Sequence, residues 1–172
     1  MLGITLHMYK LLDTVLKVLK SPVKVEEWPA RLGFQQAAYW QQFDGNQCKK
    51  LLENVDVLRR LLKPHREIYE DDTIKTIMMA FETFNDVRNA CFGLYLDENY
   101  ISHIREFGYN YSVLVNKMEK VDGITFNVIL KVHILFCHVY QFLETQNDAK
   151  LEADPNWIKK GLGYWVIIYF VF

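Results

Sequence analysis

Residues 71–91 read DDTIKTIMMAFETFNDVRNAC, and this stretch decides the class of the fold. Apolar side chains recur three and four positions apart along it, which places them on one face of an α-helix. That face consists of Ile74, Ile77, Met78, Phe81, Phe84, Val87 and Cys91. Asp71 and Asp72 precede it, where a negative charge suits the helix dipole and a carboxylate caps the first amides. The stretch predicts a long amphipathic helix that packs in a helical core.

The preceding segment, residues 46–62, has the same periodicity and predicts one strong helix that Asn46 caps and Pro64 ends. Its apolar face carries Cys48, Leu51, Leu52, Val55, Leu58, Leu61 and Leu62. Two oppositely charged pairs stand four positions apart on the other face, Lys49 with Glu53 and Asp56 with Arg60. Each such pair stabilises a helix by ~0.2–0.5 kcal/mol, so we expect much of this charge to be compensated locally.

Similar spacing predicts further helices over residues 5–20, 35–42, 97–118 and 126–144, with one or two turns at 25–31 that bury Trp28. The fold class is therefore all-α, an irregular bundle of about five to six helices. Residues 1–165 are expected to form one helical domain, since a domain typically has ~100–200 residues. Only residues 164–172 join β-branched and aromatic side chains in the manner of a strand, which predicts a short extended segment there.

The balance of charge excludes an overall electrostatic attraction to nucleic acid or to an anionic membrane. The chain has 20 basic and 21 acidic side chains and a net charge of −1. Its three cysteines form no C-x-x-C pair, which favours reduced thiols and an intracellular location in the cytoplasm or nucleus. No secretory signal is recognisable at the start, and the apolar run at residues 162–172 is shorter than the ~20 residues of a membrane-spanning helix.

The nearest approach to a metal site is His133, Cys137 and His138. His133 and Cys137 share a helical face, but His138 is turned about 140° away from His133 at ~3.6 residues per turn, so one helix cannot direct all three at one ion. Zinc requires three or four converging ligands. We expect no metal or other cofactor, and a hydrogen-bonded histidine with a small buried thiol is the favoured interpretation.

No complete catalytic set is recognisable. Cys91 and Cys137 lie on apolar stripes, where burial raises the pKa of a thiol and opposes nucleophilic catalysis. Acid–base or two-metal chemistry can be drawn from Asp71, Asp72, Asp97 and Glu98, but helix capping accounts for the three aspartates. The chain is therefore expected not to be an enzyme.

A local basic group remains as a contact for nucleic acid. It consists of Lys49, Lys50, Arg59, Arg60 and Lys63. Such side chains can bind phosphates, but Glu53 and Asp56 are interleaved with them. A solvated helix face is favoured, and DNA binding stays open as the alternative.

One combination of motifs extends over about residues 1–165. It comprises Trp28, Leu32, Tyr39, Phe43-x-Gly45-Asn46-x-Cys48-x-Lys50-Leu51-Leu52, Phe84-x-x-Val87, Cys91-Phe92-Gly93, Lys131-Val132-His133-Ile134, His138-Val139, Phe142 and Gly161-Leu162-Gly163-Tyr164-Trp165. In their order and spacing these motifs resemble transposon-derived proteins of invertebrate genomes that look like transposase remnants. The resemblance implies a helical region that in relatives is attached to, or inserted in, a ribonuclease-H-like nuclease core.

Two departures from that family pattern bear on activity. Ile129-Leu130 stands where relatives carry Thr-Pro, and residues 166–172 replace a polar Ser-Glu-Gln continuation that includes an acidic residue. The resemblance therefore implies a truncated, non-catalytic middle region that serves as a structural or interaction module. Residual nuclease or strand-transfer chemistry and accessory nucleic-acid binding are the alternatives. The partner is unknown, and the uncharged tail at 166–172 predicts self-association through strand pairing if it is exposed.

Overall fold

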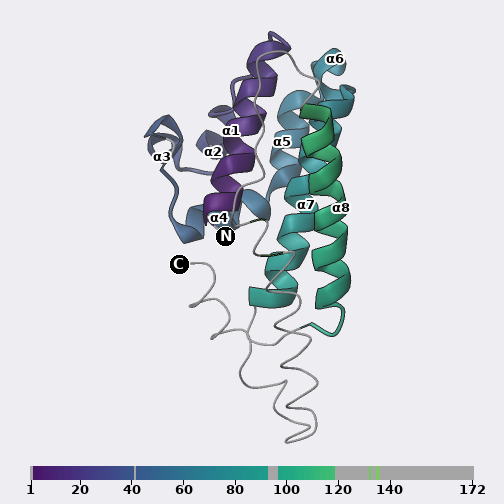
Figure 1. Cartoon of the computed structure of the whole chain (residues 1–172). Coiled ribbons are helices and arrows are strands. Elements are labelled where there is room, and N and C mark those ends of the chain that lie inside the picture. The colour runs from purple at the N-terminus through teal and green to yellow at the C-terminus, as the bar shows by residue number, and fades with distance from the viewer. Residues whose placement is uncertain (1, 41, 93–96, 119–131, 133–134, 136–172) are drawn as a thin grey trace, which may run out of the picture.

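A computed structural model describes residues 2–40, 42–92, 97–118, 132 and 135, and these residues form eight helices and no strand. The helices are α1 (Leu2–Val18), α2 (Glu27–Arg31), α3 (Gln35–Trp40), α4 (Gly45–Leu52), α5 (Val55–Leu62), α6 (Arg66–Tyr69), α7 (Asp72–Phe92) and α8 (Tyr100–Met118). Figure 1 shows them as a packed bundle from which α3 stands out at one side. The predicted all-α class is confirmed for this part of the chain.

The longest helices, α7 and α8, form an antiparallel hairpin at one side of the bundle (Figure 1). Every residue of the predicted apolar face of α7 is buried. Phe84 packs against Phe107 of α8, with ring centroids 4.9 Å apart. At the other end of the hairpin, the ammonium of Lys117 pairs with the carboxylate of Asp72 and donates to the hydroxyl of Thr76 at 2.9 Å. The hairpin is thus joined by apolar packing along its length and by a polar clasp at its end.

Helix α1 covers the other side of α7 and also contacts α4. Its side chains Met8, Leu11, Leu12 and Val15 are buried, and Leu19, just after the helix, is partly buried. The helix spans Leu2–Val18, whereas the sequence predicted 5–20. It ends because Lys20 adopts a left-handed conformation with φ of 53°, and the Ser21 amide donates back to the Leu16 carbonyl at 2.9 Å. This is the hydrogen-bond pattern of a Schellman C-cap.

Trp28 of α2 is fully buried, as the sequence predicted. Its ring meets the ring of Phe81 edge to face, with centroids 5.2 Å apart. Its indole N–H donates to the Asn54 carbonyl at 3.0 Å. One side chain therefore connects α2 to α7 and to the joint between α4 and α5.

The prediction of one continuous helix over 46–62 is wrong at that joint. Asn54 lies between α4 and α5 with φ of −128° and ψ of 39°, which is not helical. Its side-chain amide donates to the Lys50 carbonyl at 2.8 Å and so replaces the backbone donor of a regular helix turn. All seven predicted apolar residues are nevertheless buried, and the ion pairs of Lys49 with Glu53 and of Asp56 with Arg60 are present.

The cap of this region also differs from the prediction. Asp44, rather than Asn46, caps α4: its carboxylate accepts the Gln47 amide at 2.7 Å, and the Gln47 side chain accepts the Asp44 amide at 3.0 Å. The reciprocal pair is a capping box, in which two side chains each accept a backbone amide. A single asparagine cap would not provide both of these hydrogen bonds. The additional short helix α6 lies in the predicted polar stretch at 65–70 and contributes a buried Ile68. Because of the break at Asn54 and the additional helix α6, the described residues form eight helices, whereas the sequence predicted five to six.

Several predictions concern residues outside those that the structure describes. They are the extended segment at 164–172 and the tail at 166–172, and the predicted domain 1–165 is described only in part. The helix predicted over 126–144 is described only at Val132 and Leu135, which are both helical and buried. Within the described ranges, no helix is both long enough and apolar enough to cross a membrane.

Candidate interaction site

The predicted metal candidates lie outside the described residues: His133, Cys137 and His138 are not among them. Among the residues that are described, no three His, Cys, Asp or Glu side chains gather in a way that would hold a metal ion. The absence of a metal and of a cofactor therefore stays a prediction.

The two described cysteines are buried in the apolar core. Burial raises the pKa of the Cys91 thiol to about 12, with a smaller contribution from the nearby Asp97 carboxylate. Burial likewise raises the pKa of Cys48 to about 11. A thiol in this state is a poor nucleophile because the thiolate is the reactive form. The predicted packing role of Cys91 is supported, and Cys48 belongs to the same class.

The acidic candidates act at helix ends. The Asp71 carboxylate accepts the amides of Thr73 at 2.9 Å and of Ile74 at 3.1 Å. Asp97 accepts the Asn99 amide at 2.7 Å in the turn before α8. Asp72 is paired with Lys117, and hydrogen bonding from that ammonium lowers the pKa of the Asp72 carboxyl. Asp71 thus caps α7 as predicted and Asp97 stabilises the turn before α8, whereas Asp72 pairs with a lysine of α8 instead of capping.

Most of the basic group predicted as a contact for nucleic acid is already engaged within the protein. Arg59 pairs with Glu82 of α7 at 2.5 Å, and Arg60 pairs with Asp56 at 2.8 Å. Lys49 lies 3.9 Å from Glu53, whereas Lys50 donates to the Leu32 carbonyl at 2.7 Å. Lys63 is exposed, and the described residues give it no ion pair.

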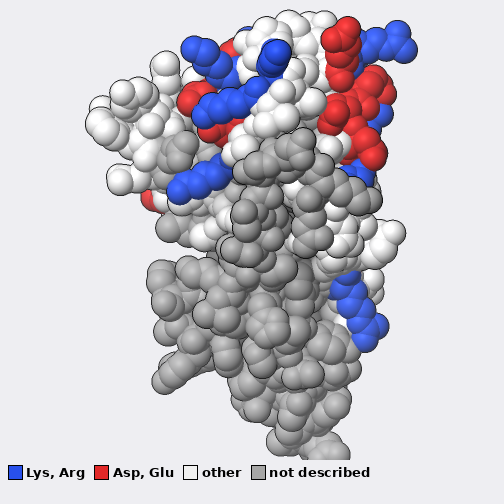
Figure 2. Space-filling view, turned by 45° about the horizontal axis from the view of Figure 1, so that its top comes forward, with Lys and Arg blue, Asp and Glu red and all other residues white. Residues whose placement is uncertain are grey.

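The charge that reaches the surface is mixed in sign. Figure 2 shows Lys and Arg side chains beside Asp and Glu side chains over the upper part of the molecule, with acidic groups gathered on the side of α6. The described surface in this view has no broad area of positive potential that would follow a phosphate backbone.

The most unusual surface surrounds α3, and it begins with a sharp change of chain direction at Gly33. Gly33 has φ of 87°, a conformation that a side chain disfavours. Its amide donates to the Ala30 carbonyl, and the next amide, that of Phe34, donates to the Pro29 carbonyl, both at 3.1 Å. This Schellman motif ends α2 and turns the chain outward into α3.

A partly buried and a buried aromatic ring hold the two ends of α3. Phe34 precedes the helix and Phe43 follows it, and their ring centroids are 5.9 Å apart. Phe43 is buried and meets Tyr9 of α1 edge to face at 4.9 Å. The Lys50 ammonium lies 5.9 Å from the centroid of Phe34. Ala38 is the buried residue of α3 itself. The short helix is therefore held against the bundle by its flanks.

The outer side of α3 carries two large aromatic side chains that are largely exposed. Tyr39 is 74% exposed and Trp40 is 65% exposed. Their rings contact each other edge to face, with centroids 5.0 Å apart and an interplanar angle of 87°. Large exposed aromatic residues, especially Tyr and Trp, are typical of binding hot spots.

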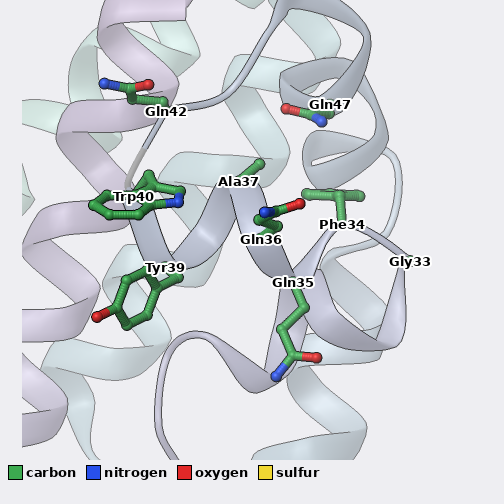
Figure 3. A pocket seen from close by; sticks show the side chains of 9 residues that line it. All are labelled: Gly33, Phe34, Gln35, Gln36, Ala37, Tyr39, Trp40, Gln42 and Gln47. Atoms are coloured by element: carbon green, nitrogen blue, oxygen red, sulfur yellow. The ribbon is translucent and has the colours of Figure 1, made fainter.

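Glutamines and the two rings line an open hollow of about 990 Å³. We use the name α3 platform for the side chains that line it and are available to a ligand, namely Gln35, Gln36, Tyr39, Trp40, Gln42 and Gln47. Figure 3 shows Tyr39 and Trp40 next to each other on the helix, with the glutamines along α3 and beyond its two ends. The other described lining residues are Gly33, Phe34 and Ala37, so the part of the chain that the structure describes contributes no charged side chain to the hollow.

Sequence reasoning did not identify the α3 platform. The signal was present in residues 33–43, which read GFQQAAYWQQF and contain no charge. Adjacent residues point about 100° apart on an α-helix, and the small Ala37-Ala38 pair is what faces the core. A helix of six residues that buries its alanines has no room to bury both neighbouring large rings.

Comparison with known proteins gives no further guide to the site: no protein-family model, no curated protein and no solved structure matches this chain.

Proposed function

We propose that this protein is a non-catalytic helical module that binds a partner protein through the α3 platform. The observation that carries the proposal is the exposed pair of Tyr39 and Trp40, whose rings meet edge to face 5.0 Å apart beside a hollow that is also lined by glutamines. Descent from a DNA-transposon-derived protein is part of this proposal, and it rests on the sequence motifs alone.

The distribution of the other side chains supports an interaction role rather than a catalytic one. The described thiols are buried with raised pKa values, and the acidic candidates cap helices or pair with a lysine. The α3 platform offers rings and amides that bind ligands, and its described residues include no carboxylate, histidine or thiol that could act as a base or nucleophile.

Nucleic-acid binding is the alternative, because bases stack on exposed aromatic rings. Single-stranded nucleic acid also requires cations along its backbone, and none of the described residues that line the hollow beside Tyr39 and Trp40 is charged. If it occurred, affinity would fall with salt at a log–log slope of about −0.7 per phosphate contact on single strands. A partner held by rings and amides predicts almost no response to salt.

The test is a selection of displayed random peptides on the full chain, followed by binding measurements with purified peptides. Enriched peptides should bind the wild-type protein and lose at least about tenfold in affinity with Tyr39→Ala or Trp40→Ala, as hot-spot residues do. Tyr109→Ala is the matched control, since Tyr109 on α8 is 70% exposed and lies outside the α3 platform. Peptides that bind all variants equally, or no enrichment at all, would contradict the proposal.

The enzyme alternative has a separate test. The purified full chain should not nick supercoiled DNA in the presence of Mg²⁺ or Mn²⁺. Nicking that co-purifies with the intact protein through successive columns would replace the interaction module with residual nuclease chemistry.

A further inference from the structure

We propose that the ligand of the α3 platform is an uncharged, proline-rich segment in the polyproline II conformation. This inference rests on the proposed function and names the chemistry of the partner. It is carried by three features of the hollow: its lack of charge, the right-angled pair of rings and the supply of amide donors.

The lack of charge limits the chemistry of the ligand. Nine of the described residues line the hollow, and none of these nine is acidic or basic. Lys50 is a described cation at this edge, and its ammonium donates to the Leu32 carbonyl at 2.7 Å and lies over the ring of Phe34. A charged peptide would lose hydration on this surface and gain no opposite charge. The complementary segment is therefore uncharged over the length that it contacts.

The ring geometry favours a ridged ligand over a flat one. Tyr39 and Trp40 stand at 87° to each other and form two walls of an open corner (Figure 3). A polyproline II helix has three residues per turn, so its pyrrolidine rings form ridges along a narrow rod. Such ridges dock in aromatic-lined grooves in several unrelated peptide-binding domains.

The glutamines can donate hydrogen bonds to the backbone carbonyls of a polyproline II helix, which have no partner within that helix. This helix has no internal hydrogen bonds, and all of its carbonyls are available as acceptors. Each glutamine has two N–H donors, and the indole of Trp40 adds one more. The side-chain carbonyl of Gln47 accepts the Asp44 amide at 3.0 Å, so the NH₂ group of Gln47 is the part that can donate to a ligand. The α3 platform thus combines ring surfaces with amide and indole donors.

The size of the α3 platform also suits a ligand that is ordered before it binds. A small contact surface cannot compensate for the ordering of a flexible peptide. Proline fixes φ near about −65°, so a proline-rich segment has little backbone freedom to lose. Attachment of α3 through Phe34 and Phe43 keeps the protein side ordered in the same way.

The direct test is titration of the full chain with N-acetylated, C-amidated deca-L-proline, followed by ¹H–¹⁵N NMR and calorimetry. Controls are a Gly-Ser peptide of equal length and an uncharged β-linked glucose hexasaccharide, because sugars also stack on aromatic rings. We expect saturable binding of deca-proline with shifts of the Trp40 indole resonance and little change between low and high salt. Trp40→Ala and Tyr39→Ala should each weaken binding by at least about tenfold, and Tyr109→Ala should leave it unchanged.

The outcomes separate this inference from the proposed function. Selected peptides that require Tyr39 and Trp40 but lack proline, together with no binding of deca-proline, would overturn the inference and leave the interaction module intact. Binding of the hexasaccharide alone would overturn both, since the ligand would then be a carbohydrate. Deca-proline binding that survives Trp40→Ala would overturn the assignment to the α3 platform. Each variant is first compared with the wild-type NMR spectrum, so that loss of binding is scored only for folded protein.

Discussion

Replacement of Trp28 by phenylalanine tests the packing of α2 against the joint between α4 and α5. The indole is fully buried, donates to the Asn54 carbonyl at 3.0 Å and meets the ring of Phe81 at 5.2 Å. Phenylalanine keeps an aromatic ring but has no N–H donor and is smaller. The change therefore removes one hydrogen bond and leaves a small cavity.

The expected loss follows from these two effects. The hydrogen bond contributes about 1 kcal/mol, near the low end for a buried group, because the Asn54 carbonyl still accepts the Val57 amide at 3.1 Å. The cavity and the weakened contact with Phe81 add about 1–2 kcal/mol. We therefore expect Trp28→Phe to lower the free energy of unfolding by about 2–3 kcal/mol.

The assay is urea unfolding of the full chain, followed by circular dichroism at 222 nm. With a slope of about 2 kcal/mol per molar urea, the midpoint should fall by about 1–1.5 M. Trp40→Phe is the control, because the ring of Trp40 is 65% exposed, and it should change the free energy by less than about 0.5 kcal/mol. Equal effects of the two substitutions would refute the assignment of Trp28 as the residue that joins these helices.

Three further predictions concern stability and are tested by the same unfolding measurement. Lys20→Gly should raise the free energy of unfolding by about 0.5–1 kcal/mol, because glycine adopts the left-handed φ of 53° without steric cost; a loss of stability would contradict this. Arg88→Ala should lower it by about 2 kcal/mol, since the nearly buried guanidinium donates to Glu53 at 2.8 Å, and an unchanged midpoint would show that this contact contributes nothing. The hydrogen bond from Lys117 lowers the pKa of Asp72 from its ordinary value of 3.8. The pair therefore stabilises the folded protein at pH values above 3.8, and this stabilisation is lost as the pH falls below 3.8. Asp72→Asn should flatten the dependence of stability on pH in that acidic range, and identical pH profiles would rule out the contribution of this pair.

The helical faces were predictable because they depend on local periodicity. The stripe from Ile74 to Cys91 is buried as expected, and the pairs of Lys49 with Glu53 and of Asp56 with Arg60 form at a spacing that any helix provides. Ion pairs between helices, such as Arg59 with Glu82, require knowledge of which helices are neighbours.

The break at Asn54 shows where periodicity misleads. The apolar spacing of residues 46–62 continues through it, so the pattern indicates one helix. The side-chain amide of Asn54 competes for the Lys50 carbonyl, and the buried indole of Trp28 takes up the Asn54 carbonyl. The first contact is local and the second comes from 26 residues away, so only the first is visible in the neighbouring sequence.

The α3 platform was missed for a different reason. Residue type favours burial of large aromatic side chains, and sequence spacing cannot tell which of several short helices lies at the edge of the bundle. Whether Tyr39 and Trp40 are covered depends on the turn at Gly33 and on the rings of Phe34 and Phe43 that hold the segment in place.

The attachment of α3 at both ends also links ligand binding to the melting of the entire bundle. An isolated helix of six residues is not stable in water, so Tyr39 and Trp40 take up their arrangement only while Phe43 is packed against Tyr9. A ligand that recognises this arrangement binds the folded chain and not the unfolded one. At a free concentration one hundred times its dissociation constant, it adds about 2.7 kcal/mol to the stability of the protein. A rise in melting temperature that requires Trp40 is therefore a direct screen for ligands of this surface.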